Sequence, residues 1–273
     1  MKSKILVVGI DGLVLERALD SGRAPTLAAL NEAGTVSALT MEAPTLSGPG
    51  WSTLLTGSSH EQHGVRDNLF AGHRLLLRPD LLSRAFYQDQ STTTFAAAGW
   101  PPLVDPAGIG PVIHERREQQ RAGLHRMIAR DGETYGYRTV DGEIAEFAVY
   151  ALNKSGPDVS FVYFCEVDDA SHLNGAVGEH YLDAISRIDA HLARLRAALE
   201  TRAHAKGERW LMVLTTDHGH LDEGGHGLGS ARERASFVIA TGIGRNNPDW
   251  PDVIAPESLV PLLLAERNPA GNV

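Results

Sequence analysis

Carboxylate, hydroxyl and imidazole side chains recur at five points of this 273-residue chain, each close to the end of a hydrophobic run. The five segments read VVGIDG, APTLSGPGW, EVDDASH, TTDHGH and GGHG. Anionic oxygens and neutral imidazoles are ligands that suit divalent zinc, iron or manganese. A serine hydroxyl beside such ions is what a metal-activated nucleophile needs. The candidate residues are Asp11, Ser47, Asp168, His172, Asp217, His218 and His226.

The elements that must position these residues are predicted from the hydrophobic pattern. Short runs of β-branched and aliphatic residues alternate with longer helical patterns, which is typical of a sheet covered by helices. We therefore expect an α/β fold with a mostly parallel central sheet sandwiched between helices. The expected strands are 4–10, 35–41, 92–98, 159–166, 210–216 and 235–241, and the expected helices are 25–33, 49–57, 115–130, 140–154, 179–202 and 257–266.

The chain shows no repeat, low-complexity linker or clear domain boundary, so we expect a single catalytic domain over residues 1–273. Residues 69–139 have the least regular pattern, and we interpret them as an insertion or cap beside the site. Asp11, Asp168 and Asp217 each follow a predicted strand. In open α/β sheets the ligand crevice lies outside the carboxyl ends of the strands, so these distant residues are expected to converge there.

Each segment also has an ordinary structural explanation. Asp168 and His172 stand four residues apart, which places both on one face of a helix, but a capped helix with an incidental histidine has the same pattern. Ser47 precedes a predicted helix, whose N-terminus favours an anion, although a plain capping serine is the alternative. Asn68 suits either a hydrogen bond to a phosphoryl oxygen or a turn. We expect His220 to lie outside the ligand set, supporting it or facing solvent.

The bulk composition excludes some functions. A net charge of −9 disfavours a surface that coats nucleic acid, so we expect no duplex binding. The single cysteine, Cys165, rules out an intrachain disulfide and suits a reducing cytoplasm. The first apolar run is too short for a secretion signal, and no stretch has the length of a membrane span. We therefore expect a cytoplasmic protein without a membrane partner; the sequence does not determine the oligomeric state.

Taken in order, the segments VVGIDG, APTLSGPGWSTLLTG, HGVRDN, DLLSRAF, EVDDASHLNG, DHGH and GGHG resemble the alkaline phosphatase superfamily, specifically the type I phosphodiesterase / nucleotide pyrophosphatase branch. The resemblance implies a mixed sheet with two divalent metal ions at its edge, zinc in the first place and manganese or iron as alternatives. One ion would be held by Asp168, His172 and His226, and the other by Asp11, Ser47, Asp217 and His218.

The same resemblance implies that Ser47 is the covalent nucleophile. Asn68 and the Ser47 backbone N–H would stabilise the phosphoryl oxygen. Two departures stand out: the diesterase branch usually has threonine at the position of Ser47, and His226 follows the DHG segment more closely than in larger relatives.

Three functions stay open at this point. The first is a phosphodiesterase or nucleotide pyrophosphatase that acts on a small phosphate ester or nucleotide through a phosphoseryl intermediate. The second is a phosphomonoesterase on a small metabolite, which needs a further positive group from Arg66, Arg74 or Arg232. The third is a non-catalytic metal- or nucleotide-binding protein. We expect the pocket wall to come from residues 69–115; Trp51, Trp100 and Trp250 are either part of a wall or core residues.

Overall fold

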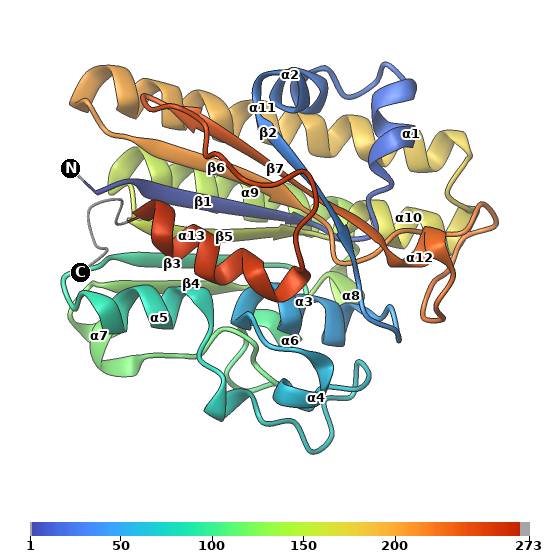
Figure 1. The fold of residues 1–273 in the computed structure, drawn as a ribbon, viewed down its shortest axis with the longest axis horizontal. Coiled ribbons are helices and arrows are strands. Elements are labelled where there is room, and N and C mark those ends of the chain that lie inside the picture. The colour runs from blue at the N-terminus through green and yellow to red at the C-terminus, as the bar shows by residue number, and fades with distance from the viewer. Residues whose placement is uncertain (1, 268–273) are drawn as a thin grey trace.

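One seven-stranded sheet forms the centre of the molecule in the computed structural model, which describes residues 2–267 (Figure 1). Its strands stand in the order β2-β7-β6-β1-β5-β3-β4. Strand β7 runs antiparallel to both of its neighbours, β2 and β6, and the other neighbouring pairs are parallel. The predicted mostly parallel α/β fold is confirmed. The strands are β1 Lys4–Ile10, β2 Thr35–Thr40, β3 Thr94–Ala98, β4 His125–Ala129, β5 Val159–Phe164, β6 Trp210–Thr215 and β7 Ala235–Ile243.

Helices cover both faces of this sheet. In β1, Ile5 and Val7 point into one apolar cluster and Leu6 and Val8 into the other, as the period of two in a strand requires. The first cluster is shared with α3 Ser47–Thr56, α5 Leu81–Gln88, α6 Pro101–Val104 and α13 Leu259–Arg267. The second is shared with α1 Leu15–Asp20, α2 Pro25–Ala33, α9 Tyr137–Lys154, α10 Glu166–Asn174 and α11 Glu179–Lys206.

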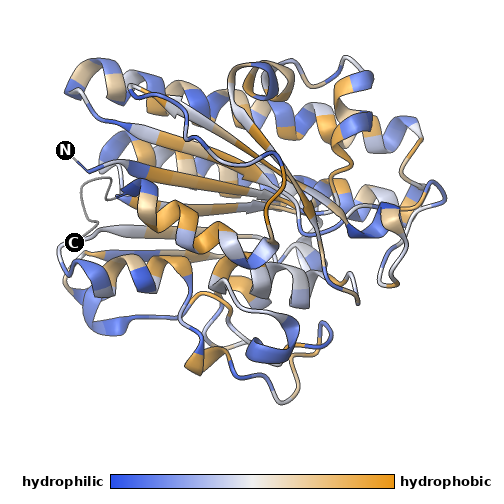
Figure 2. Cartoon of the chain, in the orientation of Figure 1, coloured by the Kyte–Doolittle hydropathy of each residue, from blue (hydrophilic) through white to orange (hydrophobic). Residues whose placement is uncertain are grey.

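The central strands are apolar along their length because they are buried on both faces (Figure 2). Short elements complete the chain between the long ones. They are α4 His60–His63, α7 Arg117–Arg121, α8 Gly132–Tyr135, α12 Ala231–Arg234 and the two 3-10 helices Leu75–Leu77 and Pro256–Ser258. Among the described residues, no helix combines the length and the apolar character needed to cross a membrane.

One predicted element is wrong. The charged segment 115–130 was expected to be a helix, but only α7 is helical there, and residues 125–129 form the edge strand β4. Pairing with β3 supplies the backbone hydrogen bonds of β4, and this contact between distant residues outweighs the local helical pattern. The prediction of a cap over 69–139 therefore needs correction in part, since β3 and β4 of this segment belong to the central sheet.

Candidate metal centre

The candidate residues gather at one edge of the sheet because three neighbouring parallel strands end there. Asp11 directly follows β1, Asp168 is the third residue of α10, which begins two residues after β5 ends, and Asp217 stands two residues after the end of β6. His226 lies in the loop between β6 and β7, and Ser47 is the first residue of α3. Residues separated by more than two hundred positions thus meet, as the strand ends predict.

Asp11 and Ser47 form one side of the centre. The side-chain oxygen of Ser47 lies 3.5 Å from Asp11 Oδ1 and 3.4 Å from His218 Nε2. The other Asp11 oxygen, Oδ2, accepts hydrogen bonds from Trp51 Nε1 at 2.8 Å and from the Tyr163 hydroxyl at 2.5 Å. These two donors fix the carboxylate so that Oδ1 faces the serine, which is how outer partners orient metal ligands.

Asp217 and His218 complete this side. Nε2 of His218 lies 3.2 Å from Asp11 Oδ1 and 3.3 Å from Asp217 Oδ2. Its other nitrogen, Nδ1, is 3.2 Å from the carbonyl oxygen of Gly219, and a carbonyl only accepts, so this nitrogen carries the proton. Nε2 is thus the nitrogen that faces the two carboxylates and Ser47.

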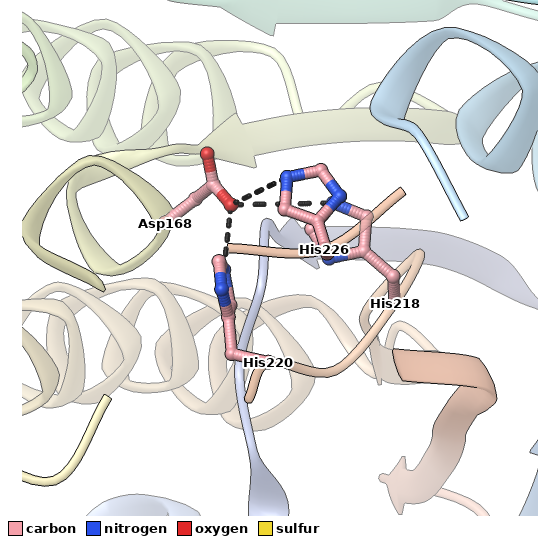
Figure 3. A group of neighbouring side chains, drawn as sticks. All are labelled: Asp168, His218, His220 and His226. Atoms are coloured by element: carbon pink, nitrogen blue, oxygen red, sulfur yellow. Dashed lines mark hydrogen bonds and ion pairs between the residues drawn. The ribbon is translucent and has the colours of Figure 1, made fainter. Parts of the chain in front are cut away.

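On the other side of the metal centre, Asp168 is surrounded by histidines (Figure 3). His226 Nε2 lies 3.5 Å from Asp168 Oδ1, and His172 Nε2 lies 3.4 Å from Asp168 Oδ2. The two histidine nitrogens are 3.0 Å apart. His226 donates through Nδ1 to the carbonyl oxygen of Thr45 at 2.6 Å, so its Nε2 is also a free acceptor. Asp168 and His172 are in contact on the same face of α10, as their four-residue spacing predicts.

The spacing of these atoms fits metal coordination. Two atoms bonded at about 2.0 Å to one tetrahedral ion lie about 3.3 Å apart. The contacts within each of the two groups implied by the family resemblance span 3.0 to 3.5 Å. His220 differs, because its Nε2 is 2.7 Å from Asp168 Oδ1, which is a hydrogen-bond distance.

His220 is buried, so of its two expected positions the one facing solvent is wrong. Gly12 makes room for its contact with Asp168. A Cβ at Gly12 would stand 2.4 Å from His220 Nε2 and 2.8 Å from Asp168 Oδ1, and the residue has a φ of +62°. Only glycine combines that backbone conformation with so close an approach. The glycine of the IDG segment is thus explained by the close approach of His220 and Asp168.

The electrostatics of the centre call for a cation. Asp11, Asp168 and Asp217 are buried, and all their ion-pair contacts within the described chain are with histidines. Both carboxylate oxygens of Asp217 are buried without a hydrogen-bond partner. Burial and the nearby Asp11 charge raise the pKa of Asp217 well above its usual range. Buried charges in proteins are paired or bind metals, so this donor set fits divalent cations.

The histidines respond to this negative charge differently. Burial opposes the charged form of His218, but Asp217, Asp11 and Asp168 raise its pKa to about 10. Burial and the neighbouring His218 lower the pKa of His226 to about 4. A metal ion at His218 would replace the proton that the three carboxylates otherwise hold there.

Asn68 lies beside the nucleophile candidate. Its Oδ1 accepts a hydrogen bond from the backbone N–H of Gly48 at 2.8 Å. Since that backbone group only donates, the amide oxygen is assigned to this contact and the Asn68 NH₂ group is left as a donor. Ser47 and Asn68 both line one cavity. The pair therefore offers a hydroxyl and an amide donor to the same bound molecule.

This cavity has a volume of about 250 Å³ and continues past the metal centre. Its remaining wall includes side chains that sequence reasoning did not assign to the site, namely Glu133, Tyr137, Tyr163, Cys165 and Asp169. Trp100 lines the cavity, which is one of the two positions predicted for it. Trp51 instead supports Asp11, and Trp250 is a buried residue of the first apolar cluster.

The three arginines considered for a phosphomonoesterase lie elsewhere. Arg74 donates to the backbone carbonyl oxygens of Glu61 and Gln62, and Arg232 pairs with Asp222 at 2.6 Å. Neither these two nor Arg66 is among the described residues that line the cavity. The wall that faces Ser47 is neutral or acidic apart from its histidines.

Comparison with known proteins places this geometry in a family. Residues 5–229 match the model of the type I phosphodiesterase / nucleotide pyrophosphatase family. The GPI ethanolamine phosphate transferase 1 of Yarrowia lipolytica is 25% identical over 279 aligned residues, which cover 90% of this chain and 27% of that protein. The catalytic subunit of human GPI ethanolamine phosphate transferase 2 is 24% identical over 36% of this chain and 10% of its own length. The chain thus spans about a quarter or less of these curated relatives.

Solved structures agree in fold. Phosphonoacetate hydrolase from Sinorhizobium meliloti 1021, in complex with phosphonoformate, has a TM-score of 0.70 at 12% identity and covers 97% of this chain and 96% of its own. Human ectonucleotide pyrophosphatase / phosphodiesterase 5 has a TM-score of 0.69 at 17% identity and covers 97% and 95%. These likenesses show the alkaline phosphatase-like fold. The family match over most of the chain shows more: the protein belongs to the type I phosphodiesterase / nucleotide pyrophosphatase family of the alkaline phosphatase superfamily.

Proposed function

We propose that this protein is a metal-dependent phosphodiesterase that acts through a covalent phosphoseryl intermediate. The observation that carries the proposal is the position of Ser47. Its hydroxyl lies at the N-terminus of α3, within 3.5 Å of Asp11 and His218, and faces a cavity of substrate size. Family membership supports the same chemistry, and the names of the curated relatives describe transfer of a phosphate ester.

Two divalent ions, zinc in the first place, are the proposed cofactors. Asp168, His172 and His226 would hold one, and Asp11, Ser47, Asp217 and His218 the other. His220 would orient Asp168 without being a ligand, since it stands at hydrogen-bond distance. When bound, the ions would lower the pKa of the Ser47 hydroxyl and of a water molecule and offset charge on the phosphoryl oxygens.

The chain's own residues would then position the reaction. The Ser47 oxygen attacks phosphorus in line with the ester oxygen that departs, and a water molecule later cleaves the phosphoserine. Asn68 donates through its NH₂ group, and the Ser47 backbone N–H donates from the first turn of α3, to the phosphoryl oxygen on which charge develops. Tyr163 and Trp51 hold Asp11 in place throughout, because both donate to the oxygen that faces away from Ser47.

The charge of the cavity favours a diester over a monoester. A monoester dianion carries one more negative charge than a diester anion and is best bound by an added cation such as an arginine fork. No lysine or arginine is among the described residues that line the cavity, whereas Glu133 and Asp169 are. A diester monoanion therefore meets less repulsion at this wall.

Turnover and trapping together test the proposal. We expect zinc-loaded protein to hydrolyse bis-p-nitrophenyl phosphate with a higher kcat/KM than p-nitrophenyl phosphate, and elemental analysis to find about two ions per chain. Rapid acid quenching followed by mass spectrometry should place the phosphoryl group on Ser47. A clear monoester preference would overturn the diesterase assignment. Absence of turnover on any phosphate ester would leave the non-catalytic binding protein as the better description.

A further inference from the structure

Thr45 contacts the metal centre although it belongs to neither ligand group. It lies two residues before Ser47 and is almost fully buried. Its backbone carbonyl oxygen accepts a hydrogen bond from Nδ1 of His226 at 2.6 Å. Its hydroxyl accepts from the backbone N–H of Gly227 at 3.0 Å and donates to the carbonyl oxygen of Leu228 at 3.1 Å. One residue therefore binds three consecutive residues of the loop between β6 and β7.

The loop that carries His226 has little regular structure of its own. Residues 221–230 form neither a helix nor a strand, and the glycines on both sides of the histidine, Gly225 and Gly227, have φ angles of +86° and +111°. Glycine loses more conformational freedom on folding than any other residue, so such a segment keeps one conformation only when other groups hold it. Thr45 is one of the groups that hold it.

Glu233 holds the far end of the same loop. Its buried carboxylate accepts hydrogen bonds from the backbone N–H groups of Leu228 at 2.8 Å and of Ser230 at 2.9 Å. These contacts fix the point where the loop enters α12. The contacts of Thr45 differ, because they act on the histidine itself and on the two residues that follow it.

The orientation of the His226 ring matters because its free nitrogen faces two proposed ligands of the same ion. His226 Nε2 lies 3.0 Å from His172 Nε2 and 3.5 Å from Asp168 Oδ1. The His226 ring also stacks on the ring of His218, with centroids 3.6 Å apart and an angle of 17° between the planes (Figure 3). A rotation of the loop would move Nε2 away from its neighbours. Groups that orient a metal-binding histidine typically change metal affinity by about 10- to 100-fold.

We propose that the Thr45 hydroxyl positions His226, and that it thereby sets the affinity of the ion assigned to Asp168, His172 and His226 but not that of the other ion. This inference rests on the ligand groups of the proposed function. Thr45 is not among the described residues that line the cavity, so it acts through His226 rather than on a substrate. The segment that presents Ser47 thus also holds a ligand of the second ion.

Zinc titration of variants at Thr45 tests this role. Thr45→Val replaces the hydroxyl with a methyl group of similar size and should weaken one of the two ions by about 10- to 100-fold, while the other stays within about twofold. Thr45→Ala removes the same hydroxyl without adding a methyl group and should act in the same way. Thr45→Ser keeps the hydroxyl and should return the affinity to within about threefold of the wild type. Competition with a chelator of known affinity measures both ions without any turnover.

Thr56→Val is the matched control. Thr56 is also buried, and its hydroxyl donates to the carbonyl oxygen of Ser52 at 2.6 Å within α3. This variant should be less stable than the wild type and keep both zinc affinities. A loss of zinc affinity as large as that of Thr45→Val would show that the Thr45 hydroxyl contributes only to packing, and would overturn the inference.

Two further backgrounds identify the ion that Thr45 affects. In Asp217→Asn the ion at Asp168 is the one expected to remain, and adding Thr45→Val should weaken it by about 10- to 100-fold. In Asp168→Asn the other ion is expected to remain, and adding Thr45→Val should leave its affinity within about twofold. An equal loss in both backgrounds would contradict a specific action on His226.

The dependence of activity on free zinc separates this inference from the proposed function. If Thr45 acts through affinity alone, excess zinc should return the kcat of Thr45→Val to within about threefold of the wild type, with KM unchanged. A kcat that stays low with both ions bound would instead place Thr45 among the groups that position Ser47, and would overturn the inference. Turnover by the wild type together with unchanged zinc affinities in Thr45→Val would also overturn it, and would leave the phosphodiesterase proposal standing. The expected loss of zinc affinity in a protein that hydrolyses no phosphate ester would do the opposite.

Discussion

Two buried polar clusters in this molecule contain similar types of residue but differ in their balance of charge. The metal-centre cluster contains three carboxylates, and within the described chain its ion-pair partners are histidines. The second cluster lies between α5, the strand β3 and the edge strand β4. There Asp80 accepts three hydrogen bonds from Leu82 and Ser83, and Arg116 donates to Ser83 and Thr94 beside His125. The second cluster supplies its own cation.

The difference separates function from structure. A buried carboxylate that has its own donors and a nearby guanidinium needs nothing from outside and contributes to one fixed arrangement of the chain. The two buried oxygens of Asp217 accept no hydrogen bond, so we expect this carboxylate to lower the stability of the fold until a cation binds. The presence of acidic and histidine residues together is thus less informative than whether the chain neutralises them.

The largest expected effect follows from removing the nucleophile. Ser47→Ala should lower kcat by at least about three orders of magnitude, because both the bond to phosphorus and the covalent intermediate are lost. Ser52→Ala is the matched control on the same helix, since the buried Ser52 hydroxyl has no hydrogen-bond partner in the described chain. Its kcat should stay near that of the wild type. Steady-state kinetics with a p-nitrophenyl diester measures both, and equal losses would show that α3 only needs intact packing.

Asp217→Asn tests whether the metal centre is short of positive charge. The variant should lose one of the two ions and about two or more orders of magnitude in activity. Its metal-free form should be more stable than the metal-free wild type by about 1–3 kcal/mol, because an amide replaces a buried carboxylate whose oxygens accept no hydrogen bond. Chemical denaturation with and without zinc measures this reversal. Metal-free Asp217→Asn that is less stable than the wild type would contradict the comparison.

Asp80→Asn is the counterpart in the second cluster. Here the carboxylate is already bonded to donors, so the same substitution should destabilise the protein by about 1–3 kcal/mol and leave zinc content unchanged. If the two Asp→Asn substitutions change the free energy of unfolding with opposite signs in one denaturation series, the two clusters differ as proposed.

His220 probes the outer partners of the metal ligands. His220→Ala should weaken zinc binding by about 10- to 100-fold, as is usual when a residue that orients a ligand is lost. His220→Asn, whose amide is able to donate to Asp168, should recover part of the affinity. A purely structural role would instead lower thermal stability equally in both variants without a change in zinc affinity. His180→Ala, an exposed position of α11, is the control.

The sequence was sufficient to predict the metal-centre cluster but not the second cluster. Asp11, Asp168 and Asp217 follow buried strands, and the rule that parallel strands end at one edge brought them together without knowledge of the loops. In the second cluster, His125 is the first residue of β4, and the charged pattern of 115–130 concealed that strand. An edge strand of five residues has a weak local signal, so its partner β3 decides its conformation.

The role of His220 had a signal that could have been used. A second imidazole two residues after His218, on a glycine-containing turn, faces the same crevice as its neighbour. Sequence spacing alone does not distinguish a ligand from a residue that orients one, because that distinction depends on a difference between 2.7 Å and about 3.3 Å. Contacts of that precision follow from packing around Gly12 rather than from the order of residues.

The smallest expected effect concerns pH and the second cluster. Burial, together with the Arg116 charge, lowers the pKa of His125 to about 4, below its usual value near 6.5. Above pH 6.5 the histidine is neutral in both the folded and unfolded states; as the pH falls from 6.5 towards 4, only the unfolded chain takes up the proton. Zinc-free protein should therefore lose about 1–2 kcal/mol of stability between pH 7 and pH 5 through this residue. His125→Gln should reduce that loss whatever its stability at pH 7, and the exposed His204→Gln should not. An unchanged pH dependence in His125→Gln would mean that this cluster does not hold its histidine neutral against Arg116.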